Sequence, residues 1–170
     1  MTNSVWGVFV GEGGYLLPNF NSQIRPYPPI EGDEGLIGIG WGKVGSMKLY
    51  ESNYKGFETQ FFKVYPTEKP IQASEVWRFA FEAKVGDWVI SPSAATGFLL
   101  VGEIISEYLS DHDGDYKLED FRHVRKVKWS HIISHNDPRY SKLNRIGMLA
   151  FSKCRFSIDE VKAKCNWSES

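Results

Sequence analysis

Aromatic and basic side chains are the residues of this sequence whose types and spacing are best suited to binding chemistry. Trp41 stands between glycines in Gly38-Ile39-Gly40-Trp41-Gly42. Glycines beside an aromatic residue indicate that its backbone passes close to another strand or to a ligand. Farther along, Arg122 to Trp129 alternates charged and apolar residues, which is typical of a half-buried strand that exposes one set of side chains.

The net charge of −1 conceals a division of the chain into two parts of opposite sign. From Arg122 to the end there are 11 Lys and Arg against 4 Asp and Glu, whereas residues 1–121 hold 9 against 17. A basic segment of this kind favours a face that binds phosphates, because the release of counterions supplies sequence-independent affinity for nucleic acid. The alternative is that these cations only solvate a strand and two helices.

Several kinds of catalytic and metal site are absent from the sequence. Glu160-Val161-Lys162 matches only the last part of a nuclease motif and lies in a predicted helix. His131 and His135 have the spacing of zinc ligands but lack the intervening glutamate and a third ligand. Cys154 and Cys165 fit neither a zinc knuckle nor a nucleophile signature, and are expected to be reduced and at least half-buried. We therefore predict no catalytic residue, no metal and no cofactor.

The length and composition favour one folded domain over residues 1–170. A hydrophobic content of 42% with 15% aromatic residues is ample for a single packed core. No apolar segment follows basic residues at the N-terminus, and no apolar run approaches the roughly 20 residues of a membrane helix. The expectation is a soluble, cytoplasmic protein.

The hydrophobic pattern predicts both strands and helices, and a long loop with several prolines at Pro18 to Gly35. The predicted strands are Ser4 to Val10, Leu36 to Trp41, Asp87 to Ser91, Phe98 to Glu103 and Arg122 to Trp129. The predicted helices span Glu51 to Tyr65 and Ile71 to Ala83, begin at Asp137-Pro138, and follow the capping box at Ser157 to Glu160. An acidic loop is expected at Asp111 to Asp120.

Periodicity also assigns structural roles to several large side chains. The residues expected in the core are Trp77, Phe81, Trp88 and Trp129. Arg78 is expected to pair with Glu82 one helical turn later, which makes a structural role likelier for it than DNA contact.

Five short motifs occur in a fixed order along the chain. They are Ile39-Gly40-Trp41, Trp77-Arg78-Phe79, Gly86-Asp87-Trp88-Val89-Ile90-Ser91-Pro92, Gly102-Glu103-Ile104 and His123-Val124-Arg125-Lys126-Val127-Lys128-Trp129. In this order, from Val8 to about Val161, they resemble the N-terminal reader domain of Mrr-type restriction endonucleases, a branch of the PUA, EVE and YTH-like group. The chain departs from the pattern at Ile90 and Ile104, where valine is usual, and at Ser110, where a second tyrosine usually follows Tyr108.

The resemblance implies an α+β fold, a PUA/EVE-like twisted β-barrel or strongly curved mixed sheet packed by several α-helices. It also implies non-catalytic recognition of a methylated or hydroxymethylated base in double-stranded DNA, which is flipped into an aromatic pocket. In such a modification-dependent restriction system, cleavage would belong to a separate nuclease domain or subunit.

The same resemblance implies a set of pocket residues. Trp41 matches the position of a cage tryptophan in YTH domains, although a core tryptophan bonded to a backbone carbonyl is the alternative. Ser91 and Ser93 would read a base edge or cap a turn. Tyr116 or Phe121 would supply the second aromatic face. His123 would donate to base or phosphate, or form a structural hydrogen bond.

The phosphate ligands are expected along the basic strand, where alternation lets only one set face outward. The candidates are Arg122, Arg125, Lys126 and Lys128. Three other functions stay open: a small hydrolase of nucleosides or RNA that uses His123 with Glu103, a module that binds a base of single-stranded RNA, and a protein-interaction domain that uses the acidic face.

Overall fold

The computed structural model describes residues 3–8, 14–18, 31–93, 97–110, 123–144, 146 and 149–165. Its strands are β1 (Val5–Val8), β2 (Gly14–Pro18), β3 (Glu34–Ile39), β4 (Trp88–Ser93), β5 (Phe98–Ile104), β6 (Leu109–Ser110), β7 (His123–Ser134) and β8 (Phe151–Lys153). Its α-helices are α1 (Tyr54–Val64), α2 (Pro70–Trp77), α3 (Pro138–Leu143) and α4 (Ile158–Cys165). Two 3-10 turns, η1 (Gly42–Val44) and η2 (Met47–Tyr50), and a π-helical turn, η3 (Arg78–Glu82), complete the described elements.

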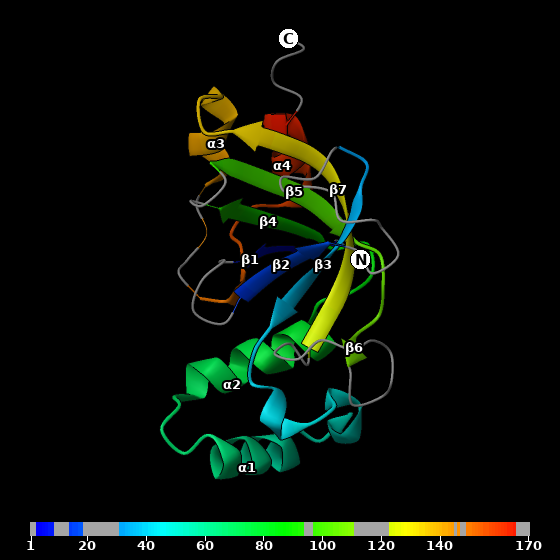
Figure 1. Ribbon diagram of the computed structural model, residues 1–170, viewed down its shortest axis with the longest axis vertical. Coiled ribbons are helices and arrows are strands. Elements are labelled where there is room, and N and C mark those ends of the chain that lie inside the picture. Colours follow the sequence, from blue (N-terminus) through cyan, green and yellow to red (C-terminus); the bar gives the residue numbers. More distant parts are fainter. Residues whose placement is uncertain are drawn as a thin grey trace.

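All eight strands belong to one curved, mixed sheet. Its order is β2-β3-β7-β5-β4-β1-β8, with β6 paired to one end of β7. Only β1 and β4 run parallel among the pairs of the described strands. The helices α1 and α2 lie at one end of the sheet, and α3 and α4 lie at the other (Figure 1). The predicted α+β class with a curved mixed sheet is therefore confirmed at this level.

Each face of the sheet is covered by its own hydrophobic core, because successive side chains of a strand point to opposite faces. On β5, Leu100 belongs to the larger core with α1 and α2, while Leu99 and Val101 belong to the smaller core with α3 and α4. Trp6 of β1 lies in the larger core, where its indole stacks on Phe151 at 4.8 Å between ring centroids.

Most predicted elements occur where the pattern placed them, and the differences are local. The helices predicted before Tyr65 and after Asp137 and Ser157 are present as α1, α3 and α4. β7 continues five residues beyond the predicted end, to Ser134. The short edge strands β2 and β8 were not predicted; β2 is held by pairing to the next strand, β3, and β8 by pairing to the distant strand β1. The predicted acidic loop lies outside the described residues.

The helix predicted from Ile71 to Ala83 forms, but its second half is π-helical. η3 closes with a hydrogen bond from the Ala83 amide to the Arg78 carbonyl at 2.8 Å, the i to i+5 bond of a π-helix. The predicted pair of Arg78 and Glu82 is confirmed at 3.6 Å, and both side chains are about half exposed.

The predicted core tryptophans and cysteines occupy partly or fully buried positions. Trp129 is fully buried, and Trp77, Phe81 and Trp88 are partly buried against the two cores. Cys154 is half-buried and Cys165 is buried, and both are free thiols. Burial raises the pKa of the Cys154 thiol to about 12 and that of Cys165 to about 11, which keeps both in the less reactive thiol form.

A β-bulge in β7 brings the Trp129 indole directly over Gly102 of β5. The pairing shifts between Val101, which faces His131, and Gly102, which faces Trp129. A Cβ on Gly102 would lie 2.6 Å from the Lys128 carbonyl oxygen and 2.7 Å from the Trp129 ring. Gly102 is therefore required because the indole occupies the space of a side chain.

We expect Gly102→Ala to lower the free energy of unfolding by about 1 to 3 kcal/mol, because the new methyl group overpacks the core. Urea unfolding followed by circular dichroism measures the change. Gly40→Ala is the control, because a Cβ there would meet nothing within 4 Å. Equal stabilities of the two variants would contradict the packing argument.

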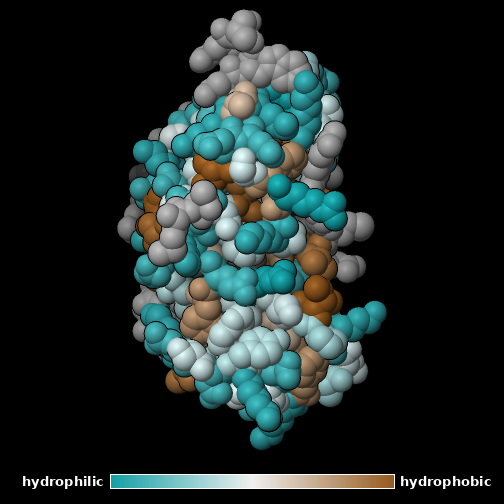
Figure 2. Space-filling view, turned by 180° about the vertical axis from the view of Figure 1, so that it is seen from behind, coloured by the Kyte–Doolittle hydropathy of each residue, from teal (hydrophilic) through white to brown (hydrophobic). Residues whose placement is uncertain are grey.

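The rear face of the molecule is mainly polar. Figure 2 shows hydrophilic residues over most of the rear face, interrupted by separate hydrophobic areas. Among the described helices, none has the length and apolar character needed to cross a membrane. The described residues also contain no group of three or more His, Cys, Asp or Glu side chains that could hold a metal ion.

Candidate functional site

Trp41 lies just after β3 in a strained backbone conformation. Its φ of 63° and ψ of 36° place it in the left-handed region, which non-glycine residues rarely adopt. The indole is partly exposed and packs on the larger core, so it is neither sealed inside nor free of the fold. Strain of this kind costs on the order of 1 to 3 kcal/mol and clusters at functional sites.

The turn that follows Trp41 is braced by side chains of η2 and of the end of α1. The Tyr50 hydroxyl donates to the Val44 carbonyl at 2.8 Å, and the Lys43 amide donates to the Tyr65 hydroxyl at 2.9 Å. The flanking glycines predict that the backbone of Trp41 passes close to another strand or to a ligand. No such contact lies at Gly40, where a Cβ would meet no atom within 4 Å.

The close contact occurs instead at the carbonyl of Trp41, which meets the ring of His123. His123 Nε2 lies 3.2 Å from this oxygen, and His123 Nδ1 lies 2.6 Å from the Tyr108 hydroxyl. Since a carbonyl oxygen only accepts, Nε2 carries a proton, and in the neutral imidazole Nδ1 then accepts from the Tyr108 hydroxyl. The Tyr108 oxygen in turn accepts from the Met47 amide at 3.2 Å. The hydrogen bonds that run from Met47 through Tyr108 and His123 to the Trp41 carbonyl form a relay, which fixes the backbone of Trp41.

The prediction that His123 donates to a base or phosphate is therefore corrected. Its side chain has no exposed surface, and both ring nitrogens are engaged by Trp41 and Tyr108. The structural alternative describes it better, because it positions Trp41 through the backbone.

The prediction that Arg125 binds a phosphate is also corrected, because its guanidinium is buried. Its Nη1 donates to the carbonyls of Phe79 and Ala83 at 2.9 and 2.7 Å, and its Nε donates to Ser106 at 3.0 Å. A cation at these carbonyls complements the negative end of the helix dipole. Burial lowers the pKa of Arg125 to about 10, against the opposing effect of the nearby carboxylates Glu107 and Asp87, so the group stays charged at neutral pH.

Lys126 and Lys128 form the outward set of β7, as the alternation predicts. Lys126 is partly exposed and Lys128 is exposed, whereas His123 and Arg125 point inward. Lys128 lies directly between Glu34 of β3 and Glu103 of β5 in the strand register. Side chains paired in this way share a face, so these carboxylates offset much of the charge of Lys128. Lys126, opposite Leu36, is the better phosphate ligand of the two.

Ser91 does not contribute to a site near Trp41. Its hydroxyl is fully buried and donates to the Val8 carbonyl at 2.9 Å, which ties β4 to β1. The prediction that Ser91 reads a base edge is therefore corrected. Ser93 ends β4, and its side chain lies outside the described part of the chain. Tyr116, Phe121 and Arg122 also lie outside the described residues.

Two polar residues that hold backbone segments in place were missed from the sequence. Tyr108 was noted only for its spacing to Ser110, and Asp87 only as part of the Gly-Asp motif. The buried carboxylate of Asp87 accepts hydrogen bonds from the Ser4 and Lys84 amides and from the Trp6 indole, each at 2.9 Å. Motif spacing does not reveal such partners, because they are distant in the sequence. Asp87 bonds to Trp6, and Tyr108 bonds to Met47.

We expect Tyr108→Phe to lower the free energy of unfolding by about 1 to 3 kcal/mol, because it leaves the buried His123 Nδ1 and Met47 amide without this hydroxyl. Chemical denaturation measures the loss. Tyr140→Phe is the control, because Tyr140 lies on α3 at the other end of the sheet. Unchanged stability of Tyr108→Phe would show that the relay contributes nothing.

Comparison with known proteins gives one family match. Residues 31–150 match DUF8426, described as a domain of unknown function. Neither the curated proteins nor the solved structures contain a significant match to the chain. The matched segment runs from β3 to the residue before β8 and includes Trp41, Tyr108, His123 and Arg125. Because this match covers well over half of the sequence, the protein belongs to the DUF8426 family.

Proposed function

We propose that this protein is a non-catalytic, EVE/PUA-like reader that accepts a modified DNA base against the indole of Trp41. The observation that carries the proposal is the geometry of this residue: a partly exposed ring on a strained backbone whose carbonyl is held by buried His123. A rigid aromatic face offers a stacking surface that costs little reorganisation when the ligand binds.

The energetics of base flipping are compatible with such a surface. Extrusion of a base costs about a few kcal/mol, and stacking on one aromatic side chain returns roughly 1 to 3 kcal/mol per base. A methyl group in a fitted apolar pocket adds about 1 to 3 kcal/mol of discrimination. Lys126 on the outward face of β7 supports the proposal as a contact to the backbone phosphates.

Cleavage is assigned to a separate nuclease domain or subunit in this proposal. Glu160 and Lys162 lie on α4, where the nuclease motif would need adjoining strands. The proposal therefore concerns recognition alone.

The experiment is a binding screen of the protein against matched duplexes. One duplex carries no modification, and the others carry 5-methylcytosine, 5-hydroxymethylcytosine or N6-methyladenine at the same position. Each is measured at low and moderate salt, beside single-stranded RNA of the same sequence with and without N6-methyladenine. Tighter binding of one modified duplex supports the proposal.

Two results would overturn the proposal. Preference for RNA over both kinds of duplex would favour a single-stranded RNA module. Absence of binding to every nucleic acid at low salt would favour a protein-interaction domain.

A further inference from the structure

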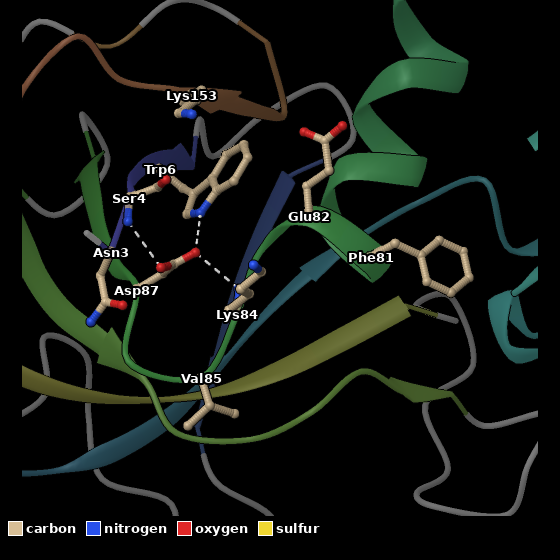
Figure 3. Close-up of a pocket in the computed structure, with 9 residues that line it drawn as sticks. All are labelled: Asn3, Ser4, Trp6, Phe81, Glu82, Lys84, Val85, Asp87 and Lys153. Atoms are coloured by element: carbon tan, nitrogen blue, oxygen red, sulfur yellow. Dashed lines mark hydrogen bonds between the residues drawn. The ribbon is translucent and has the colours of Figure 1, made fainter. Parts of the chain in front are cut away.

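An open hollow of about 580 Å³ lies between the start of β1, the end of η3 and the edge strand β8. Pockets that hold cofactors and drug-sized ligands span about 300 to 1,000 Å³, so a nucleotide fits a space of this size. Figure 3 shows the Trp6 indole and the Asp87 carboxylate joined by a hydrogen bond among the lining residues, which also include Glu82. The hollow shares none of its lining residues with the Trp41 relay.

The walls of this hollow are fixed by the buried carboxylate of Asp87. The Lys84 amide donates to Asp87, and the Asp87 amide donates back to the Lys84 carbonyl at 3.0 Å. The same carboxylate accepts from the Trp6 indole at 2.9 Å (Figure 3). The loop that carries Lys84 is therefore held to β1 before any ligand arrives.

A second lysine is placed on the same hollow by strand pairing. Lys153 of β8 lies directly opposite Trp6 of β1 in the antiparallel register. Directly opposed residues project their side chains from the same face of a sheet. Lys153 and Lys84 thus reach the hollow from two different elements, and both side chains are exposed.

The lining of the hollow carries two carboxylates and two ammonium groups, and both carboxylates have partners. Glu82 is paired with Arg78 at 3.6 Å, and Asp87 is near the buried cation of Arg125 and accepts three hydrogen bonds. Among the residues that line the hollow, the remaining charged side chains are the two lysines.

We propose that this hollow binds a small phosphate-bearing ligand of nucleotide size, with Lys84 and Lys153 as the cations available to its phosphate. Ammonium groups bind phosphate through strong charge-assisted hydrogen bonds. Val85 supplies apolar lining for the remainder of such a ligand, whereas the ring of Phe81 is turned away and packs on Trp77 (Figure 3). The proposal is independent of base recognition at Trp41.

Isothermal titration of the whole chain with adenosine monophosphate, adenosine and inorganic phosphate tests this site. We expect adenosine monophosphate to bind more tightly than either of the others, because only it has both the charge and the size. Lys84→Gln and Lys153→Gln should each weaken its binding roughly tenfold or more, since each removes one charged donor. Lys142→Gln, an exposed lysine on α3, is the matched control and should leave binding unchanged.

The outcomes separate this proposal from the proposed function. Failure of adenosine monophosphate to bind, equal binding of adenosine, equal binding of inorganic phosphate, or unchanged binding in both lysine variants would overturn it. The variant Trp41→Ala should bind adenosine monophosphate as the natural protein does. The two lysine variants should retain any preference for modified DNA, so either site can fail while the other stands.

Discussion

Trp41→Ala is expected to abolish the preference for modified over plain DNA while leaving salt-sensitive background binding in place. Loss of one stacking face costs about 1 to 3 kcal/mol, or roughly 5- to 150-fold in affinity for the modified duplex. Background binding should survive because it depends on phosphate contacts that the indole does not make. Fluorescence anisotropy with labelled duplexes at two salt concentrations measures both quantities.

The structure offers matched controls for this experiment. Trp41→Phe keeps an aromatic face and should retain part of the discrimination. Lys126→Gln removes an outward cation of β7 and should weaken binding to plain and modified DNA alike, with a decrease of about 1 in the salt slope. The relay from Met47 to His123 contacts the backbone carbonyl of Trp41. Truncation of the Trp41 side chain therefore leaves the relay intact. Unchanged discrimination in Trp41→Ala would refute the proposed pocket.

Arg125→Met is expected to cause the largest loss of stability, about 3 to 5 kcal/mol. The substitution leaves the buried carbonyls of Phe79 and Ala83, and the partly buried carbonyl of Ser106, without the Arg125 donor. It also removes the cation that offsets the buried carboxylate of Asp87. Urea unfolding followed by tryptophan fluorescence measures the difference in the free energy of unfolding.

Two variants distinguish this structural role from phosphate binding. Arg125→Lys keeps the charge but loses the forked geometry, so it should recover only part of the stability. Lys128→Met changes an exposed neighbour on the same strand and should alter stability by less than about 0.5 kcal/mol. If Arg125→Met kept full stability and lost only DNA binding, the guanidinium would be a phosphate ligand after all.

The strand from His123 to Trp129 shows what residue alternation predicts and what it does not. Alternation identified the strand and required that one set of side chains face outward, and β7 satisfies both. Alternation alone does not tell which set is buried, because both sets contain cations and valine. Here His123, Arg125, Val127 and Trp129 all point inward, so four motif residues serve the core and the relay.

The edge strands β2 and β8 could not be predicted from local sequence patterns. Each is short, and its backbone becomes extended because another strand offers hydrogen-bond partners, the next strand β3 for β2 and the distant strand β1 for β8. Phe151 of β8 gains further from stacking on Trp6, some 145 residues earlier in the chain. Local propensity carries no information on such pairing.

The sequence by itself determined most helices and central strands, the pairing of Arg78 with Glu82, and the separation of acidic from basic parts. These properties follow from periodicity and composition, which act within a few residues, whereas the class of the fold came from the order of the five motifs through the resemblance that they carry. Only the tertiary structure decided that His123 and Arg125 are positioning residues, that Ser91 is buried, and that Lys84 and Lys153 share a hollow. Such roles depend on which distant backbone carbonyls and carboxylates require a partner, and that is settled only when the elements pack together.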